Sequence, residues 1–398
     1  MRRYLPGLLD AGASSASTLI AGLAAARLLE LDQLGAYALV FSTLLLAAQL
    51  PTQLVLVPSE ARLVALESSQ RVERLFATVR SAGGWSLVAG LATLAVGLTM
   101  TPGVDATARW MLGATGALAA FASPLQDHLR RMLHLAGRHN AAALVSLARL
   151  AIVALILVIG VSAEIPTPLL PLGALALGDM LPLGSVLLSR WSRAATLPFA
   201  RRELRRDGGW LLASASAAPA AGFLTSVIVT WLAGASSLGV AEAARIVAQP
   251  VLVLAGGVAA VLGPRAMEAA QRKDEATGIR LNQRFWALLT VAGLIYVGLT
   301  LLPDNINPLA RITPAAFQLP WLAQLSVVAA VVNAMVMLRR SELVVESRTR
   351  FLAVCEAWAG LSRGVVASGA TWWHAWTVPF GFLVGGFVRI LLMRRHRG

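Results

Sequence analysis

Several charged residues stand inside long apolar stretches of the sequence, and these are the residues most able to do chemistry. The clearest are Arg27, Arg149, Asp179, Glu242 and Arg245. A charged side chain at the centre of a lipid bilayer costs about 2.5–3.5 kcal/mol on insertion scales, unless it is paired or hydrated. Each of these residues is therefore expected to have an ion-pair partner, a bound ligand or a water-filled cavity.

Arg27 and Arg245 are candidates for binding an anion. Arg27 lies near the outward end of the first apolar stretch, and Arg245 lies near the outward end of the eighth, one helical turn from Glu242. If the two stretches face a shared cavity, their guanidinium groups are suited to holding the oxygens of a pyrophosphate group. The alternative is that both arginines are interfacial anchors whose side chains reach lipid headgroups.

Arg149 and Asp179 are expected to meet in the membrane. They lie in consecutive apolar stretches whose connecting turn is centred near residue 165, and each is a similar number of residues from that turn. An antiparallel hairpin brings them to the same depth, where a salt bridge stabilises both charges. The pair is either a static buried ion pair or a site at which Asp179 binds a proton or cation during a conformational cycle.

Three further residues are weaker cavity candidates. Asp10 is one turn into the first apolar stretch, where a carboxylate also stabilises the positive end of a helix dipole. Glu356 and Arg363 are seven residues apart and share one helix face, so they line a cavity or pair with another helix.

The composition requires helices that cross a membrane to position these residues. Of 398 residues, 57% are hydrophobic and 14% are charged, whereas soluble domains have about 25% charged residues. The mean hydropathy is +0.70. An all-α integral membrane protein is predicted, with about twelve transmembrane helices of roughly 20 residues each. The stretches lie near 8–28, 35–57, 76–100, 107–127, 141–161, 169–189, 209–232, 240–262, 285–302, 318–338, 352–370 and 372–393.

The basic residues predict the orientation of these helices. Placing the N-terminus in the cytoplasm puts 28 of the 34 Lys and Arg residues in inward segments, and only Arg109 and Arg311 in outward loops. Cytoplasmic loops of membrane proteins carry such an excess. Both termini are therefore expected in the cytoplasm.

A weak internal repeat divides the chain. Leu34-Gly35 and Leu238-Gly239 follow similar runs of small residues, and each precedes a proline, Pro58 or Pro264. Six helices per copy give a parallel repeat about an axis along the membrane normal, with substrate between the halves. The expected domains are an N-terminal six-helix lobe (1–189), a cytoplasmic linker (190–208) and a C-terminal six-helix lobe (209–398).

The motifs of several other classes of protein are missing from the sequence. It has no GxxxxGK[ST] motif, its only lysine is Lys273, and its only cysteine is Cys355. The basic residues form short clusters between apolar stretches, unlike a nucleic-acid-binding surface. The sequence predicts no enzyme, no cofactor, no metal site and no nucleic-acid partner.

Several segments resemble the polysaccharide flippase branch of the multidrug/oligosaccharidyl-lipid/polysaccharide (MOP) exporter superfamily. They are Asp10 with Ser14, Ser15 and Ser17, the runs "ARLL" and "LGAY", the loop "LRRMLHLAGRHNAA", and "GVAEAARIVAQPVLVLAGGVAAVLGPRAM". The resemblance implies a MATE/MOP-like fold of two six-helix lobes around a central cavity that opens alternately to each side. It also implies that Arg27 and Arg245 bind the cargo, an oligosaccharide on a polyprenyl pyrophosphate. At 398 residues the chain is short for that family.

The resemblance further implies the surroundings of the protein: a bacterial cytoplasmic membrane, membrane lipids, an H⁺ or Na⁺ gradient and proteins of glycan assembly. Two alternatives stay open. A drug or cation exporter of the same superfamily would have an acidic or apolar cavity. A non-transporting scaffold of a glycan assembly complex would have a collapsed cavity, with Arg27 and Arg245 facing lipid or packed against carboxylates.

Overall fold

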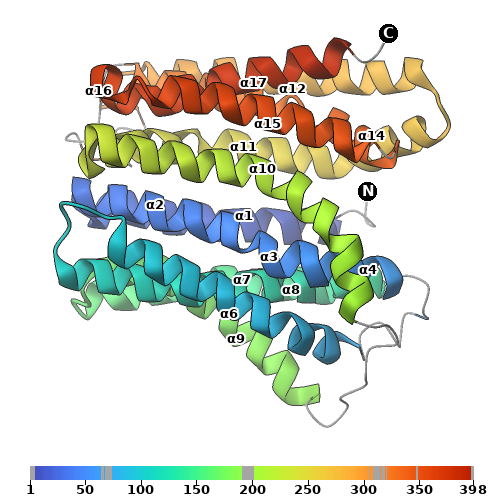
Figure 1. The fold of residues 1–398 in the computed structure, drawn as a ribbon, viewed down its shortest axis with the longest axis horizontal. Helices are drawn as coiled ribbons and strands as arrows, with labels where there is room; N and C mark the ends of the chain where they lie inside the picture. The colour runs from blue at the N-terminus through green and yellow to red at the C-terminus, as the bar shows by residue number, and fades with distance from the viewer. Residues whose placement is uncertain are drawn as a thin grey trace. The chain divides into compact units, whose positions relative to one another are not determined.

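The fold is taken from a computed structural model. It describes residues 5–63, 67, 74–190, 201–303, 305–307, 314, 319, 321–346 and 348–395, and these residues contain helices and no strand (Figure 1). The linker residues 191–200 and the outward Arg311 lie outside the described residues. All twelve predicted apolar stretches coincide with helices, which confirms the all-α fold class.

The chain divides into two compact units, and the division falls within helices. Unit 1 comprises residues 1–24 and 39–219, and unit 2 comprises residues 25–38 and 220–398. The helices divided between them are α1 (Leu5–Leu28), α2 (Leu31–Ala47) and α10 (Arg201–Ala233). The segment that carries Arg27 therefore groups with unit 2, although it lies within residues 1–189.

The remaining elements follow in chain order. Unit 1 contains α3 (Gln49–Pro51), the π-helix η1 (Thr52–Leu56), α4 (Val57–Leu63), α6 (Leu75–Thr99), α7 (Ala106–Leu135), α8 (His139–Ser162), η2 (Thr167–Leu169) and α9 (Leu170–Arg190). Unit 2 contains α11 (Ala235–Gln271), α12 (Glu275–Thr300), α13 (Leu322–Ala334), α14 (Met337–Val345), α15 (Thr349–Ala367), α16 (Ala370–Trp373), η5 (His374–Trp376) and α17 (Thr377–Arg395).

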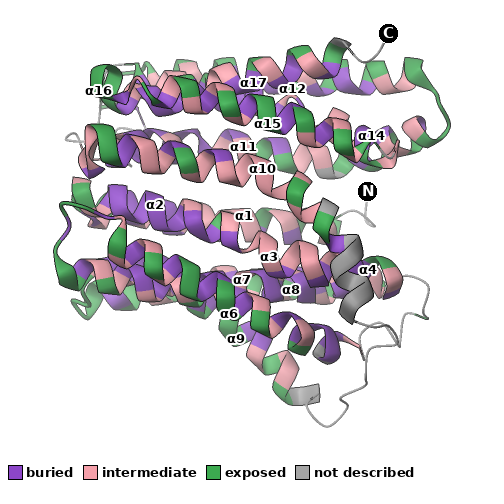
Figure 2. Cartoon of the chain, in the orientation of Figure 1, coloured by how far each residue is buried: buried purple, intermediate pink, exposed green. Residues whose placement is uncertain are grey.

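The helices have the lengths and surfaces of membrane spans. Within the described residues, ten helical segments are long and apolar enough to cross a bilayer. Figure 2 shows exposed residues along the whole length of helices such as α6 and α15. Many of these exposed residues are large and apolar, including Leu91, Val158, Leu294 and Val365, each more than half exposed. Such surfaces fit a lipid environment, and the chain is a multi-pass integral membrane protein.

Aspartate caps begin two of the long helices. Asp105 Oδ1 accepts the backbone N–H of Ala108 at 2.9 Å, and Asp274 Oδ1 accepts that of Thr277 at 3.0 Å. These bonds satisfy donors that the first turn of a helix leaves free. The hydrogen bonds from Thr277 lower the pKa of the Asp274 carboxyl because they stabilise its charged form.

Gly35 and Gly239, the two glycines of the proposed repeat, meet each other's helices in unit 2. A Cβ on Gly35 would overlap the carbonyl of Ala235, and a Cβ on Gly239 would overlap that of Leu31. Each glycine thus packs against the residue four positions before the other glycine. This reciprocal contact lets the starts of α2 and α11 approach closely within unit 2.

This contact predicts opposite effects for two glycine substitutions on α11. Gly239→Ala places a methyl group against the Leu31 carbonyl and should destabilise the protein by about 1–3 kcal/mol, as overpacking does. Gly256→Ala meets nothing within 4 Å and should be neutral or stabilise the helix by up to about 1 kcal/mol. Thermal unfolding in detergent measures both. Equal stability of the two variants would contradict the close contact.

Candidate functional site

Asp10 is the centre of a polar network in unit 1. Its carboxylate accepts two bonds of 2.8 Å from the Nε and Nη2 atoms of Arg130, and a third of 2.5 Å from the Ser146 hydroxyl. The Nε2 atom of His134 lies 2.9 Å from Asp10 Oδ2. Asp10 is 5% exposed. Asp10 therefore connects α1 to α7 through Arg130 and to α8 through Ser146. Its role is wider than stabilising the start of its own helix.

The same network continues to the predicted ion pair. Arg130 and Arg149 both donate to the Ser14 hydroxyl oxygen, at 2.9 and 3.1 Å. The Nε atom of Arg149 lies 2.7 Å from Asp179 Oδ1, as the hairpin geometry predicted. The Ser123 hydroxyl donates to the other Asp179 oxygen. One chain of contacts therefore connects α1, α7, α8 and α9.

Sequence reasoning missed Arg130 as a member of this network. The apolar stretch was expected to end at residue 127, with Arg130 in an inward loop, whereas α7 continues to Leu135. The added turns carry Arg130 and His134, and Arg130 donates a 2.7 Å hydrogen bond to Oδ1 of Asp127, the last residue of the predicted stretch. The spacing of 127, 130 and 134, at i, i+3 and i+7, was the available signal for one helix face.

A second buried cluster in unit 1 was also missed. His128 is fully buried, and its Nδ1 lies 2.6 Å from Glu60 Oε1 while its Nε2 lies 2.7 Å from the Thr78 hydroxyl. Arg131 Nε donates to the same Glu60 oxygen at 2.8 Å. Glu60 lies in α4, directly after the π-helix η1. The cluster joins α4, α6 and α7.

Arg245 and Glu242 form a forked pair on α11 in unit 2. The Nε and Nη2 atoms of Arg245 each donate to a different Glu242 oxygen at 2.6 Å. The Glu242 side chain is 7% exposed and that of Arg245 is 32% exposed. The charge of Arg245 is therefore already balanced by its neighbour, while its side chain stays partly exposed.

Arg27 lies in the last turn of α1 and is exposed. Among the described residues, no salt bridge to Arg27 is present. Its guanidinium is thus accessible to a ligand or to lipid headgroups. The Glu242 carboxylate pairs with Arg245 and not with Arg27.

Glu356, Arg363 and Arg389 form a buried charged cluster deep in unit 2. The Nη2 atom of Arg389 lies 2.8 Å from Glu356 Oε2. The Nη2 atom of Arg363 donates to Asn333 Oδ1 at 2.9 Å, and its guanidinium lies 4.2 Å from the centre of the Phe382 ring. All three charged residues are at most 6% exposed. Glu356 and Arg363 share helix α15, as predicted. The partner of Glu356 is Arg389, the first residue of the predicted inward segment 389–397.

The described residues contain no cluster of His, Cys, Asp and Glu side chains that could hold a metal ion. Cys355 is buried beside the Glu356–Arg389 pair.

Comparisons with solved structures identify the fold. The eukaryotic MATE transporter AtDTX14 superposes with a TM-score of 0.70 at 15% identity, over 99% of this chain and 94% of that chain. An inward-facing multidrug resistance MATE transporter of the MOP superfamily gives 0.64 at 13% identity, with the same coverage. A MOP superfamily transporter from Pyrococcus furiosus, reported to have a binding pocket of reversed polarity, gives 0.58 at 14% identity, again over 99% and 94%.

The class of protein defined by this architecture is an all-α membrane protein with the fold of MATE transporters of the MOP superfamily. The identities of 13–15% show the fold alone. No protein family matches the sequence, and no curated protein matches it significantly.

Proposed function

We propose that the chain is an alternating-access exporter whose cargo is anionic, and that the cargo is an oligosaccharide on a polyprenyl pyrophosphate. The MATE/MOP fold, found in both inward-facing and outward-facing solved structures, supports the transport part of the proposal. Both termini are proposed to lie in the cytoplasm, on the basis of the inward excess of basic residues.

The observation that carries the anionic cargo is the excess of arginine at membrane depth in unit 2. Within the described residues, Arg245 and Arg389 form ion pairs with Glu242 and Glu356, whereas Arg363 donates to the Asn333 amide oxygen. The exposed Arg27 adds a fourth guanidinium. Uncompensated positive charge between low-dielectric helices attracts anions and repels cations. The transporter of reported reversed pocket polarity indicates that this fold also accommodates sites of altered charge.

Arg27 and Arg245 are proposed to contact the cargo, because Arg27 is exposed and the Arg245 side chain is partly exposed. Pyrophosphate binding at Arg245 would compete with Glu242 for the same donors. The Asp10 and Asp179 network of unit 1 is proposed as the place where an H⁺ or Na⁺ gradient is coupled to transport. It contains three carboxylates (Asp10, Asp127 and Asp179) and two arginines, so the carboxylates outnumber the arginines by one.

Complementation of a flippase-deficient bacterial strain tests the proposal. The wild type is expected to restore the polymer, and Arg27→Ala and Arg245→Ala should each reduce the rate about tenfold or more, the effect of losing one charge-assisted hydrogen bond. The matched control is Arg272→Ala, which removes an arginine that is exposed and paired with Glu268. Full rescue by both variants would remove these residues from the binding site. Export of cationic drugs without rescue would replace an anionic cargo with a cationic one.

A second candidate function, a scaffold in a glycan assembly complex, is favoured by one observation. The Arg245 guanidinium packs against Glu242, as expected of a protein that no longer binds cargo there. A scaffold predicts that Arg27→Ala and Arg245→Ala support polymer assembly fully, while deletion of the chain reduces co-purification of the assembly proteins. Loss of transport of a labelled lipid-linked saccharide in vesicles containing Arg245→Ala would exclude it.

A further inference from the structure

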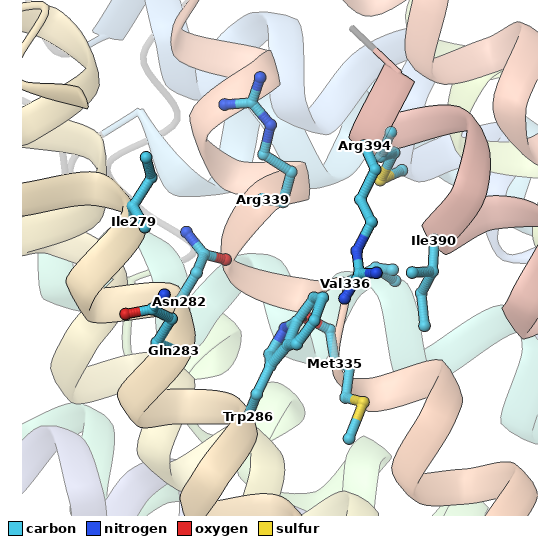
Figure 3. Close-up of a pocket in the computed structure, with 10 residues that line it drawn as sticks. Ile279, Asn282, Gln283, Trp286, Met335, Val336, Arg339, Ile390 and Arg394 are labelled. Atoms are coloured by element: carbon cyan, nitrogen blue, oxygen red, sulfur yellow. The ribbon is translucent and has the colours of Figure 1, made fainter. Parts of the chain in front are cut away.

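Unit 2 contains a pocket whose function is not explained by the proposed transport pathway. It has a volume of about 180 Å³ and is formed where the start of α12, the junction of α13 and α14, and the end of α17 come together (Figure 3). Pockets for drug-sized ligands are about 300–1,000 Å³. A pocket of this size accepts a small group such as a phosphate rather than a whole saccharide or lipid.

The break between α13 and α14 shapes this pocket. The helix is interrupted at Met335 and Val336, and the indole N–H of Trp286 donates to the Met335 carbonyl at 2.7 Å. That bond satisfies a carbonyl near the interruption and fixes the Trp286 ring in the wall. The ring is thereby held in one orientation by the backbone.

The fixed tryptophan ring holds one arginine in place. The guanidinium of Arg394 lies 4.8 Å from the centre of the Trp286 ring, and Figure 3 shows it reaching from α17 toward that ring. Contact with the face of an indole ring stabilises an arginine without neutralising its charge. Arg394 is exposed, so its hydrogen-bond donors remain accessible.

The other arginine of the pocket is balanced by carboxylates. The Nη1 atom of Arg339 lies 2.8 Å from Glu342 and 3.2 Å from Glu346. Glu342 in turn accepts a 2.6 Å bond from the Asn282 amide. Glu346 Oε2 also lies 3.6 Å from Arg348 Nε, so the two glutamates are matched by two arginines, and Arg394 supplies the net positive charge of the pocket. Arg339 and Asn282 shape its polar side.

The apolar part of the pocket lining comes from all three of its elements, α12, the junction of α13 and α14, and α17. It is formed by Ile279, Met335, Val336, Ile390 and Met393. An apolar wall beside one accessible guanidinium matches a molecule with an anionic group and a hydrocarbon part. Basic pockets between membrane helices at the cytoplasmic side are where phospholipid headgroups bind.

We infer that this pocket binds the phosphate headgroup of an anionic phospholipid from the surrounding leaflet. Arg394 would donate to the phosphate, with Trp286 holding the guanidinium in place. The acyl chains would remain outside, beginning along the apolar wall. This site is separate from Arg27 and Arg245, so it does not depend on the identity of the cargo.

Lipid titration of the detergent-purified full chain, followed by native mass spectrometry, tests the inference. The probes are phosphatidylglycerol, which is anionic, and phosphatidylcholine, which has no net charge. The wild type is expected to bind phosphatidylglycerol about tenfold or more tightly than phosphatidylcholine, and Arg394→Gln should remove most of that difference. Trp286→Leu should reduce phosphatidylglycerol binding as well, because the guanidinium loses its support.

The matched control is Arg272→Gln, which removes an exposed arginine outside the pocket and should leave the preference unchanged. Equal binding of the two lipids by the wild type would overturn the inference, as would an equal loss in Arg394→Gln and Arg272→Gln. Displacement of phosphatidylglycerol by millimolar inorganic phosphate would also overturn it, in favour of a free phosphate ligand. A normal thermal unfolding midpoint for Arg394→Gln shows that the change in binding is not caused by misfolding.

Discussion

Replacing Asp10 with Asn should destabilise the protein by about 3–5 kcal/mol, the effect of breaking a buried ion pair by removing one partner. Asp10 accepts both ends of the Arg130 fork as well as the Ser146 hydroxyl, and its side chain is 7% exposed. An Asn amide cannot balance the arginine charge, and its NH₂ group would oppose a donor. Thermal unfolding by circular dichroism in detergent should show a midpoint lower by about 4–6 °C.

The matched control for this prediction is Asp127→Asn on the same arginine. Asp127 also bonds Arg130, at 2.7 Å, but its side chain is 47% exposed. Solvent screens such a pair, so the loss should be at most about 1 kcal/mol. An equal loss in the two variants would show that Asp10 does not organise the network. The double variant Asp10→Asn with Arg130→Met should recover part of the stability, because no uncompensated charge is then left buried.

The sequence predicted the helices well because apolar stretches of membrane length have few alternatives in a bilayer. It predicted the Arg149–Asp179 pair because consecutive helices joined by a short turn have a known relative depth. The Asp10–Arg130 contact spans 120 residues in the sequence. Finding it would have required knowing which helices pack together and that α7 continues past residue 127. Hydropathy carries neither piece of information.

Helices α7 and α15 are not among the ten described helical segments that are long and apolar enough to cross a bilayer. Helix α7 has many small and polar residues between Arg109 and Gln126, and α15 carries Glu356 and Arg363 near its middle, so neither helix is uniformly apolar. Their charged side chains are satisfied by other helices of the same unit. Both helices nonetheless contribute charged side chains to the buried polar clusters of their units, so their lower apolar character accompanies internal pairing.

Replacing Glu356 in unit 2 with Gln should lower the free energy of unfolding at least as much as Asp10→Asn does, by about 3–5 kcal/mol. The single carboxylate of the cluster would be lost, and Arg389 and Arg363 would remain buried together, at 6% and 4% exposure. The only cysteine of the chain, Cys355, is adjacent and fully buried, so it reports on this region. A thiol-reactive fluorescent dye should label it at a lower temperature in the variant than in the wild type.

The control Glu268→Gln separates this effect from the loss of any ion pair. Glu268 bonds Arg272 at 2.6 Å, but the two side chains are 56% and 74% exposed, so at most about 1 kcal/mol should be lost. The double variant Glu356→Gln with Arg363→Met tests whether the two buried arginines repel each other. Within the described part of the chain, Arg363 donates to Asn333 and to no carboxylate. Removing its charge should therefore relieve repulsion with Arg389 and raise the labelling temperature again. A further decrease in that temperature would mean that Arg363 stabilises unit 2 through packing on Phe382 more than its buried charge destabilises it.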